Sequence, residues 1–435
     1  MAETGTDKPP DEGITSIRVQ GFKSLVDSGE VRIAPLTLLA GANSSGKSSL
    51  MQPLLLLKQT LESPYDPGGL LLDGPHVSFS ATRQFLSKGS DGLNLRVGLG
   101  REWCWLNFEL GTSGRLEPLA AATGSANGPT GTLRSGMSTQ ELYNENDANL
   151  LVSVWRALAS GATAVPPIRV GTRRGLLVVE VGDLEIDQKL IGLGPLSSKI
   201  TSILHVPGNR GSAERSYPLA ATGSHTPGPF PPYTASLILS WQRSPYSPLS
   251  ALGEDLAYLD LAHGLAASQP NEGTVSLSVS RLPRLARLAV RDRVDVADTG
   301  MGIGYSLPVL VALRAAQPGQ LVYIEQPELH LHPRAQLGLA TILVEAAKRG
   351  VRVVAETHSE LLLLGVQTAI ARGEIDPKDV ALHWFERGDD GVTKITTAEI
   401  DDVGTFGDWP EDFGNVALDA QEEFLNAVHS RRTGK

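Results

Sequence analysis

The sequence predicts an α/β fold: a mixed sheet with flanking helices, an additional antiparallel β lobe, and an inserted region between two halves of the chain. Apolar runs typical of strands alternate with stretches of helical apolar spacing near both ends of the chain. A glycine-rich loop, GANSSGKSS at residues 41–49, joins such a strand to such a helix in the first half. In the second half, the run LVYIE ends in Glu325, and the run VRVVAETHSE carries His358.

The first half of the chain indicates strands around one early helix. The helix follows the glycine loop, where Leu50, Leu54 and Leu57 recur at helical spacing. Residues 112–137 are rich in Gly, Ser, Thr and Ala, so a loop or a boundary is expected there. Strand-type segments cover residues 14–22, 30–41 and 93–111.

The second half begins with an irregular stretch. Residues 206–233 hold six prolines, which favour fixed turns, and helices are expected to dominate from residue 234 to about 298. Strands and helices then alternate: a strand at 321–325, a helix at 334–348, a strand at 351–355 and a helix at 359–371. A last helix is expected to pack through Leu418, Phe424, Leu425 and Val428.

These patterns divide the chain into five parts. We expect a disordered leader at 1–13, the N-terminal half of the main domain at 14–111, an inserted region at 112–270, the C-terminal half at 271–399 and a tail at 400–435. Residues 112–200 carry no pattern that indicates a function.

Composition bounds the kind of protein. The chain of 435 residues has 38 Lys and Arg against 48 Asp and Glu, so a DNA-binding surface would have to be a local basic patch. The single Cys104 cannot form an internal disulfide, which fits a reducing cytoplasm. No apolar run reaches the roughly 18 residues that a membrane span needs, and the leader lacks the pattern of a signal peptide. A cytoplasmic protein without a membrane partner is therefore expected.

The glycine loop satisfies the Walker A pattern G-x-x-x-x-G-K-[ST]. Gly41 and Gly46 allow the tight turn that points backbone N–H groups at phosphate oxygens. Lys47 would neutralise β/γ-phosphate charge, and Ser48 would offer its hydroxyl to Mg²⁺. The other candidate nucleotide contacts of this loop are Asn43, Ser44, Ser45 and Ser49.

Two strand ends predict the remaining groups of an ATP site. Glu325 would hold Mg²⁺ together with Ser48, and Gln326 follows it at the position where water is activated. His358 would sense the γ-phosphate. Taken alone, each residue also suits an ordinary buried strand end; their order after a Walker A loop favours the catalytic interpretation.

A second glycine-rich segment, DTGMGIGYSLPVL at residues 298–310, precedes a predicted helix. A glycine loop at a helix N-terminus is an anion site. Because this loop is expected on the face opposite the Walker A loop, it would meet ATP bound to a second subunit. Its candidate residues are Gly300, Gly302, Gly304 and Ser306; a glycine turn without a ligand is the alternative.

In this order, the Walker A loop, the 298–310 loop, IEQPELHLHP and ETHSE resemble the motifs of ABC-type P-loop ATPases of the OLD/RecF/SMC group. Within that group the chain is similar to stand-alone bacterial AAA family ATPases of defence-type operons. The early IRVQGFKSL resembles the group's first strand and places Lys23 near the nucleotide, and HVPGNRGSAERSYP resembles an insert that puts Arg210 and Arg215 forward. The resemblance implies an ABC-type ATPase head that forms head-to-head dimers around ATP and Mg²⁺.

The chain departs from the resemblance at two places. Gly304, Tyr305 and Ser306 stand where many relatives have Ser-Gln, and Gln326 stands where a catalytic glutamate is usual. Three interpretations of Gln326 stay open. It orients the water without taking its proton, Glu328 or Glu356 serves as base, or hydrolysis is so slow that ATP holds a clamp closed.

Two further clusters carry alternatives. His330 and His332 in ELHLHP could bind a metal with Glu328, although a loop that couples two nucleotide sites is favoured. Arg284, Arg287 and Arg291 share one face of a helix, which would suit either a solvated surface or DNA phosphates.

The function expected from these observations is slow ATP hydrolysis by a homodimer or higher homo-oligomer. By resemblance, the dimer would control a separate effector protein, a nuclease or toxin, in anti-phage defence. The alternatives are a non-hydrolysing scaffold locked by ATP and a RecF-like DNA-repair ATPase stimulated by DNA.

Overall fold

The computed structural model describes residues 13–112, 114–126, 128–138, 141–142, 168–181, 184–185, 193–223, 226–280, 293–407 and 416–433. The leader, except Gly13, and the arginines at 284, 287 and 291 lie outside these ranges. Among the described helices, none is long and apolar enough to cross a membrane.

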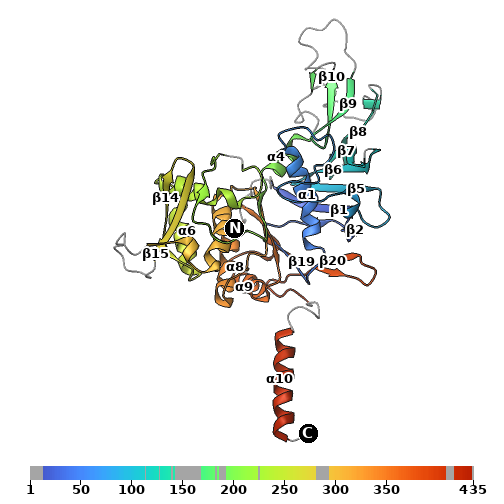
Figure 1. Cartoon of the computed structure of the whole chain (residues 1–435). Helices are drawn as coiled ribbons and strands as arrows, with labels where there is room; N and C mark the ends of the chain where they lie inside the picture. Colours follow the sequence, from blue (N-terminus) through green and yellow to red (C-terminus); the bar gives the residue numbers. More distant parts are fainter. Residues whose placement is uncertain are drawn as a thin grey trace, which may run out of the picture.

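A six-stranded, mainly parallel sheet forms the centre of the molecule (Figure 1). β17 and β18 are followed by helices, as the sequence predicts. The order across the sheet is β12 (Leu204–Val206), β17 (Leu321–Glu325), β18 (Arg352–Thr357), β4 (Leu36–Gly41), β19 (Val380–Arg387) and β20 (Thr393–Thr397), of which only β20 is antiparallel to its neighbour. β18 thus separates β17 from β4.

Both faces of this sheet are covered, which explains why its strands are continuous apolar runs. On β18, Val353 and Ala355 belong to one core, while Val354 between them belongs to the other. The first core contains residues of α5 (Thr234–Gln242), α6 (Leu249–Tyr258), α7 (Met301–Ala315), α8 (Pro333–Lys348) and α9 (Glu360–Ala371). The second contains residues of α1 (Lys47–Leu61) and α4 (Gly194–Thr201).

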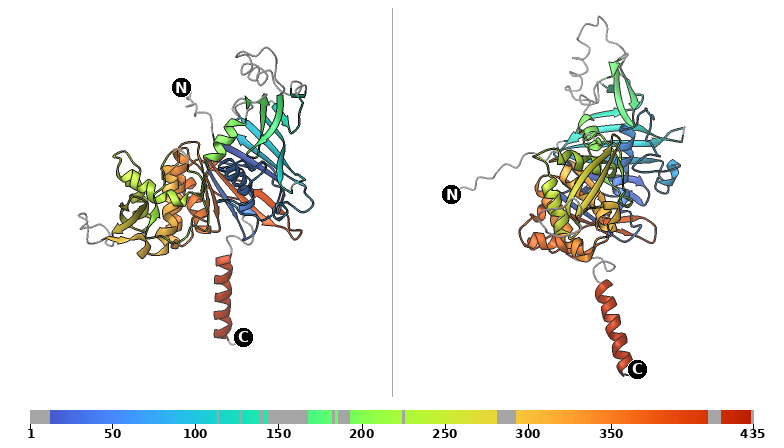
Figure 2. Two further views of the ribbon diagram at one scale, coloured as in Figure 1. Left: turned by 45° about the horizontal axis from the view of Figure 1, so that its top comes forward. Right: turned by 60° about the vertical axis from the view of Figure 1, so that its left-hand side comes forward.

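The second core also joins α1 to a seven-stranded antiparallel sheet, the β lobe that the sequence predicts (Figure 2). α1 is buried almost all round because it lies between the two sheets. The strands of the lobe are β1 (Ile14–Phe22), β2 (Leu25–Asp27), β3 (Val31–Arg32), β5 (Gly92–Leu99), β6 (Glu102–Leu110), β7 (Leu116–Ser125) and β8 (Gly128–Arg134).

Smaller elements complete the described fold. A three-stranded sheet contains β9 (Ile168–Arg173), β10 (Leu176–Val181) and β11 (Leu184–Glu185). A four-stranded sheet contains β13 (Tyr217–Pro218), β14 (His263–Asn271), β15 (Thr274–Ser280) and β16 (Arg293–Asp295). The short 3₁₀ helices are η1 (Thr82–Gln84), η2 (Pro231–Tyr233), η4 (Val296–Asp298) and η5 (Pro377–Asp379).

Three expectations about elements were wrong. Residues 112–137 are not a loop, because most of them form the paired strands β7 and β8, whose small side chains do not prevent backbone pairing. Residues 234–298 are not mainly helical: β14 and β15 form a hairpin that buries Val275, Leu277 and Val279. The final helix α10 (Val416–Thr433) does not pack through Phe424 and Leu425, which are 65% and 56% exposed.

The predicted domain boundaries stay predictions. Backbone pairing continues from β6 to β7 across residue 111, and β12, from within the predicted insert, pairs with β17 at the edge of the central sheet. α10 projects away from the two sheets (Figures 1 and 2).

Candidate nucleotide site

The Walker A loop joins the end of β4 to the start of α1. Its glycines are required by their surroundings: a Cβ on Gly41 would lie 2.3 Å from the Phe385 carbonyl oxygen, and one on Gly46 would lie 2.5 Å from Thr393 Oγ1. Both glycines and Ser44 have positive φ, at 146°, 104° and 61°. Side chains rarely adopt this backbone conformation, so the sequence pattern reflects a real steric need.

The end of α1 that meets this loop is open to an anion. No side chain caps the helix there, and its first turn has no acidic residue. The Lys47 ammonium donates to the carbonyl oxygens of Gly41 (2.9 Å) and Ala42 (2.7 Å), which folds the side chain back over the loop. Burial lowers the pKa of Lys47. The N–H groups of the first turn and this cation together suit a phosphate.

The Walker A loop is also held by Thr393, a residue that the sequence analysis does not predict as part of the site. Thr393 on β20 has its Oγ1 2.7 Å from the Ser45 carbonyl oxygen and 2.7 Å from Ser24 Oγ. One hydroxyl carries one hydrogen, so Thr393 donates to Ser45 and accepts from Ser24. Lys23, next in the chain to Ser24, donates to Gln52 Oε1 on α1 at 2.6 Å.

Glu325 and Glu356 are neighbours in register at the ends of β17 and β18. Glu325 nevertheless points away from the Walker A loop. Its Oε1 is 3.2 Å from His205 Nε2, and its Oε2 accepts from the Gly208 N–H at 2.9 Å. Burial acts to raise the pKa of Glu325, but the hydrogen bonds from His205 and Gly208 outweigh it and leave the pKa below its usual value.

Glu356 is the carboxylate that meets the Walker A serine. Ser48 Oγ donates to Glu356 Oε2 at 2.8 Å, and the Tyr323 hydroxyl donates to the other oxygen. Burial raises the pKa of Glu356 to about 7. The structure therefore brings Ser48 to Glu356, whereas the sequence predicts that Ser48 acts with Glu325.

Gln326 is held in a strained backbone conformation with φ of 45°. Its N–H donates to the Glu356 carbonyl oxygen at 2.9 Å. Arg210 donates to the carbonyl oxygens of Glu325 at 2.6 Å and Gln326 at 2.8 Å. Burial lowers the pKa of Arg210 to about 10. Within the described ranges the Gln326 side-chain amide has no hydrogen-bond partner, so it is free to contact a ligand.

Glu328 lies beside His358. Its Oε1 accepts from the His358 backbone N–H at 2.8 Å, and its Oε2 is buried without a hydrogen-bond partner among the described residues. Burial raises the pKa of Glu328 and lowers that of His358. A buried carboxylate oxygen with no donor is a candidate for contact with a bound ligand or water.

The glycines at the start of α7 permit close backbone approach. A Cβ on Gly302 would lie 3.2 Å from the His330 carbonyl oxygen, and one on Gly304 would lie 2.7 Å from the Ala213 nitrogen. Gly300 caps the helix, and Ser306 is buried with its hydroxyl unpaired in the described part of the chain. This turn lies near the end of β17, and the sheet places β18 between β17 and the Walker A strand.

The two histidines of ELHLHP have local structural contacts. The His330 ring packs on Tyr305 with centroids 4.3 Å apart, and His332 caps α8 by accepting from the Arg334 N–H. No group of three or more His, Cys, Asp or Glu residues that could hold a metal occurs in the described ranges. The metal interpretation of these histidines therefore has no third ligand.

Arg215, which the sequence also puts forward, pairs with Asp298 on the exposed surface.

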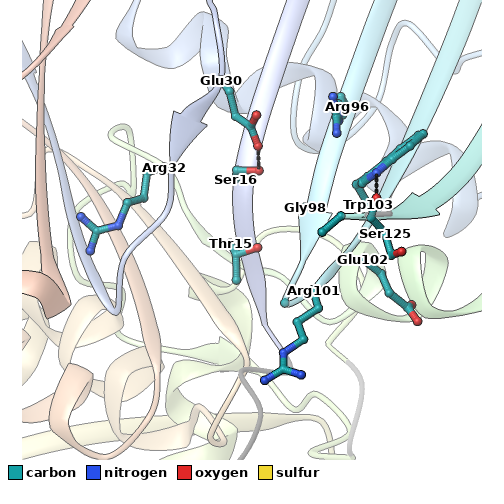
Figure 3. A pocket seen from close by; sticks show the side chains of 12 residues that line it. Thr15, Ser16, Glu30, Arg32, Arg96, Gly98, Arg101, Glu102, Trp103 and Ser125 are labelled. Carbon is teal, nitrogen blue, oxygen red and sulfur yellow. Dashed lines mark hydrogen bonds between the residues drawn. The ribbon is translucent and has the colours of Figure 1, made fainter. Parts of the chain in front are cut away.

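A hollow of about 600 Å³ lies elsewhere, on the antiparallel sheet (Figure 3). Ser16 donates to Glu30 at its edge, and Trp103 donates to the Ser125 carbonyl oxygen. None of the Walker A residues, Glu325 or Gln326 is among the residues that line it. It is therefore separate from the candidate nucleotide site.

Comparison with known proteins finds a family match in the second half of the chain. Residues 253–364 match the family model described as "AAA domain, putative AbiEii toxin, Type IV TA system". This match includes the start of α7, Glu325, Gln326 and His358 but not the Walker A loop. No curated protein matches the sequence significantly.

Solved SMC head domains are similar to the chain at low sequence identity. The SmcHead bound to the C-winged helix domain of ScpA has a TM-score of 0.44 at 11% identity, over 89% of this chain and 98% of that one. The SMC head domain from Thermotoga maritima has a TM-score of 0.40 at 12% identity, over 89% and 100%. The Pyrococcus furiosus Smc head bound to the C-terminal domain of ScpA has 0.42 at 11%, over 96% and 99%.

The Walker A loop from the first half and the AAA-matched segment from the second half meet at one edge of a parallel sheet. One strand, β18, lies between the Walker A strand and the strand that ends in Glu325. The order of the motifs and this topology match the mixed α/β P-loop fold that the sequence predicts, and the AAA-domain match lies over its second half.

Proposed function

We propose that the protein binds ATP with Mg²⁺ at the Walker A loop, hydrolyses it slowly, and uses the cycle to control a partner protein. One observation carries the proposal: Lys47 and Ser48 lie at the same sheet edge as Glu356, Glu328 and His358. These groups come from segments about 300 residues apart in the chain.

The donor set at this edge fits a nucleotide with its metal. The uncapped start of α1 and Lys47 supply N–H groups and positive charge for phosphates. A serine hydroxyl and a carboxylate are oxygen ligands, which Mg²⁺ prefers, and Mg²⁺ commonly takes only one or two such ligands from the protein beside the phosphates. When bound, Mg²⁺ would neutralise charge on the phosphates.

Gln326 explains why turnover would be slow. An amide can orient the attacking water but cannot take its proton. Arg210 donates to the backbone carbonyl oxygen of Gln326, so only the side chain would remain to be ordered when the amide orients water. Of the two alternative bases, Glu328 has the stronger support, because its buried Oε2 has no partner among the described residues and its pKa is raised.

The position of α7 supports a shared site between two subunits. The 300–306 turn approaches Ala213 and His330 through Gly304 and Gly302, on the far side of β18 from the Walker A loop. Met301 in this turn is 57% exposed. We therefore propose that the 300–306 turn contacts ATP bound to the partner subunit in a homodimer.

The partner is proposed to be a separate effector, a nuclease or toxin, and the setting anti-phage defence. The toxin–antitoxin wording of the matched family supports this setting. A non-hydrolysing, ATP-locked scaffold is the second candidate, and Gln326 is the observation that favours it. The RecF-like alternative depends on arginines outside the described ranges.

The test is specific ATPase activity measured against protein concentration, for the wild-type chain and Lys47→Ala. Activity that rises with concentration and is lost in the variant is the expected result, because each site would need two subunits. Activity independent of concentration at the lowest levels would contradict the shared site in a reversible dimer. Tight ATP binding with no turnover would favour the scaffold.

A further inference from the structure

The carboxylate beside the Walker A hydroxyl is not the one at the end of β17. Ser48 Oγ donates to Glu356 Oε2 at 2.8 Å, although Glu356 lies on β18, two residues before His358. Glu325 occupies the equivalent register position on β17, one strand farther from the Walker A strand β4. The distance along the sheet therefore favours Glu356 as the partner of Ser48.

Glu325 is also engaged in other contacts through both oxygens. His205 donates to Oε1 and the Gly208 N–H donates to Oε2. One further hydrogen bond leads from His205 into the core, where His205 Nδ1 lies 2.9 Å from His76 Nδ1. Turning Glu325 toward Ser48 would break this buried arrangement and leave polar groups unpaired.

The spacing of Ser48 and Glu356 matches the geometry of a shared metal ion. Mg²⁺ binds oxygen at about 2.0–2.1 Å in octahedral geometry, so two adjacent ligands of one ion lie about 2.9 Å apart. The observed separation of 2.8 Å is close to this edge length. The same two oxygens could thus pass from a direct hydrogen bond to joint coordination without a change of rotamer.

The surroundings hold Glu356 in this orientation. Its second oxygen accepts from the Tyr323 hydroxyl, and the Tyr323 ring stacks on His205 with centroids 5.2 Å apart and an interplanar angle of 11°. Glu356 is 4% exposed, so its free rotation is prevented by packing. A buried carboxylate aimed at the Walker A hydroxyl is a preorganised ligand.

We propose that Glu356, together with Ser48, coordinates the Mg²⁺ of bound ATP, and that Glu325 is a positioning residue held by His205. This proposal rests on ATP binding at the Walker A loop, as proposed above. The two alternative bases then have different roles. Glu356 binds the metal, and Glu328 takes the proton from water.

The test is the metal dependence of ATP affinity in the full chain, measured by calorimetry with ATP in EDTA and with ATP in Mg²⁺. Binding of Mn²⁺ to the protein–ATP complex, followed by electron paramagnetic resonance, gives a readout that needs no turnover. Glu356→Gln and Glu325→Gln are the matched variants, because each replaces one carboxylate by an amide of the same shape.

We expect Glu356→Gln to weaken Mn²⁺ binding to the ATP complex on the order of tenfold or more, with ATP affinity in EDTA unchanged. Glu325→Gln should retain most of the Mn²⁺ affinity. The opposite order, or equal losses in both variants, overturns the proposal. If the wild-type chain binds no ATP with or without metal, the proposed function fails before the metal question arises.

Ser48→Ala tests the same ion from its other ligand, and the double variant with Glu356→Gln tests whether the two residues share it. Ser48→Ala and Glu356→Gln should be non-additive, since losing either ligand already disrupts the same ion. Additive losses of Mn²⁺ affinity would mean that the two residues act independently and would contradict a shared ion. Circular dichroism and thermal unfolding of each variant verify that the fold is retained.

Discussion

The hydroxyl of Thr393 provides the sharpest test of how the Walker A loop is held. It is 3% exposed, donates to the Ser45 carbonyl oxygen and accepts from Ser24 Oγ. Thr393→Val keeps the shape of the side chain and removes both hydrogen bonds. Leaving a buried donor or acceptor without a partner costs about 1–3 kcal/mol, so the free energy of unfolding should fall by about that amount.

Part of this loss should appear in ATP binding, because the Ser45 carbonyl belongs to the loop that would cradle phosphate. A loss of about 1.4 kcal/mol from the binding-competent loop weakens affinity about tenfold. The assays are urea unfolding and ATP titration, with Thr393→Ser as the control that keeps the hydroxyl. Equal stability and equal ATP affinity for Val and Ser at this position would show that the hydroxyl does not hold the loop.

Three further predictions concern turnover, pH and packing. Gln326→Glu should raise the ATPase rate constant on the order of tenfold or more by adding a base, and an unchanged rate constant at equal ATP affinity would count against the role of Gln326. His383, whose pKa burial lowers from 6.5 to about 4, accepts from Thr397 and donates to the Arg32 carbonyl. As the pH drops, His383 takes up a proton in the unfolded chain before it does so in the folded chain, so the free energy of unfolding should fall by up to about 3 kcal/mol between pH 6.5 and 4. Urea unfolding should show a smaller fall for His383→Asn. An identical fall would contradict this role of His383. Gly304→Ala should lower stability by about 1–3 kcal/mol through overpacking, because its Cβ would lie 2.7 Å from the Ala213 nitrogen. Gly300→Ala, with open space around it, is the control in thermal unfolding, and equal effects would argue against the close contact.

The parts of the fold that the sequence predicts well are those with local signals. The buried run LVYIE at β17 matches the predicted strand, and the predicted helices at 334–348 and 359–371 correspond to α8 and α9. The Walker A loop was predictable because its pattern is contiguous in the sequence, and Gly41 and Gly46 adopt the positive φ that this turn needs.

The features that the sequence did not predict either depend on long-range contacts or lie in segments whose composition was misinterpreted. The β14–β15 hairpin had a usable signal in TVSLSVS, whose alternation is typical of a half-buried strand. No sequence signal pointed to Thr393, because its hydrogen-bond partner Ser45 lies 348 residues away in the chain. Glu356 could have been noticed as a carboxylate at a buried strand position, but only the strand order places it, and not Glu325, beside Ser48.

The exposed helix α10 illustrates a limit of pattern reasoning. Phe424 and Leu425 suggested a packed helix, yet both are largely exposed. Apolar side chains identify a face that could be buried, while whether it is buried depends on a complementary surface elsewhere. Nothing within the 416–433 segment encodes that surface.

We propose that two distant halves of the chain form one site that binds and cleaves ATP. A single-turnover experiment tests it directly: protein in excess over radiolabelled ATP with Mg²⁺, followed by separation of ATP, ADP and phosphate over hours. We expect slow, complete conversion to ADP by the wild-type chain and none by Lys47→Ala. ATP that stays bound and intact in the wild-type chain, or cleavage that persists in the Lys47 variant, would contradict it.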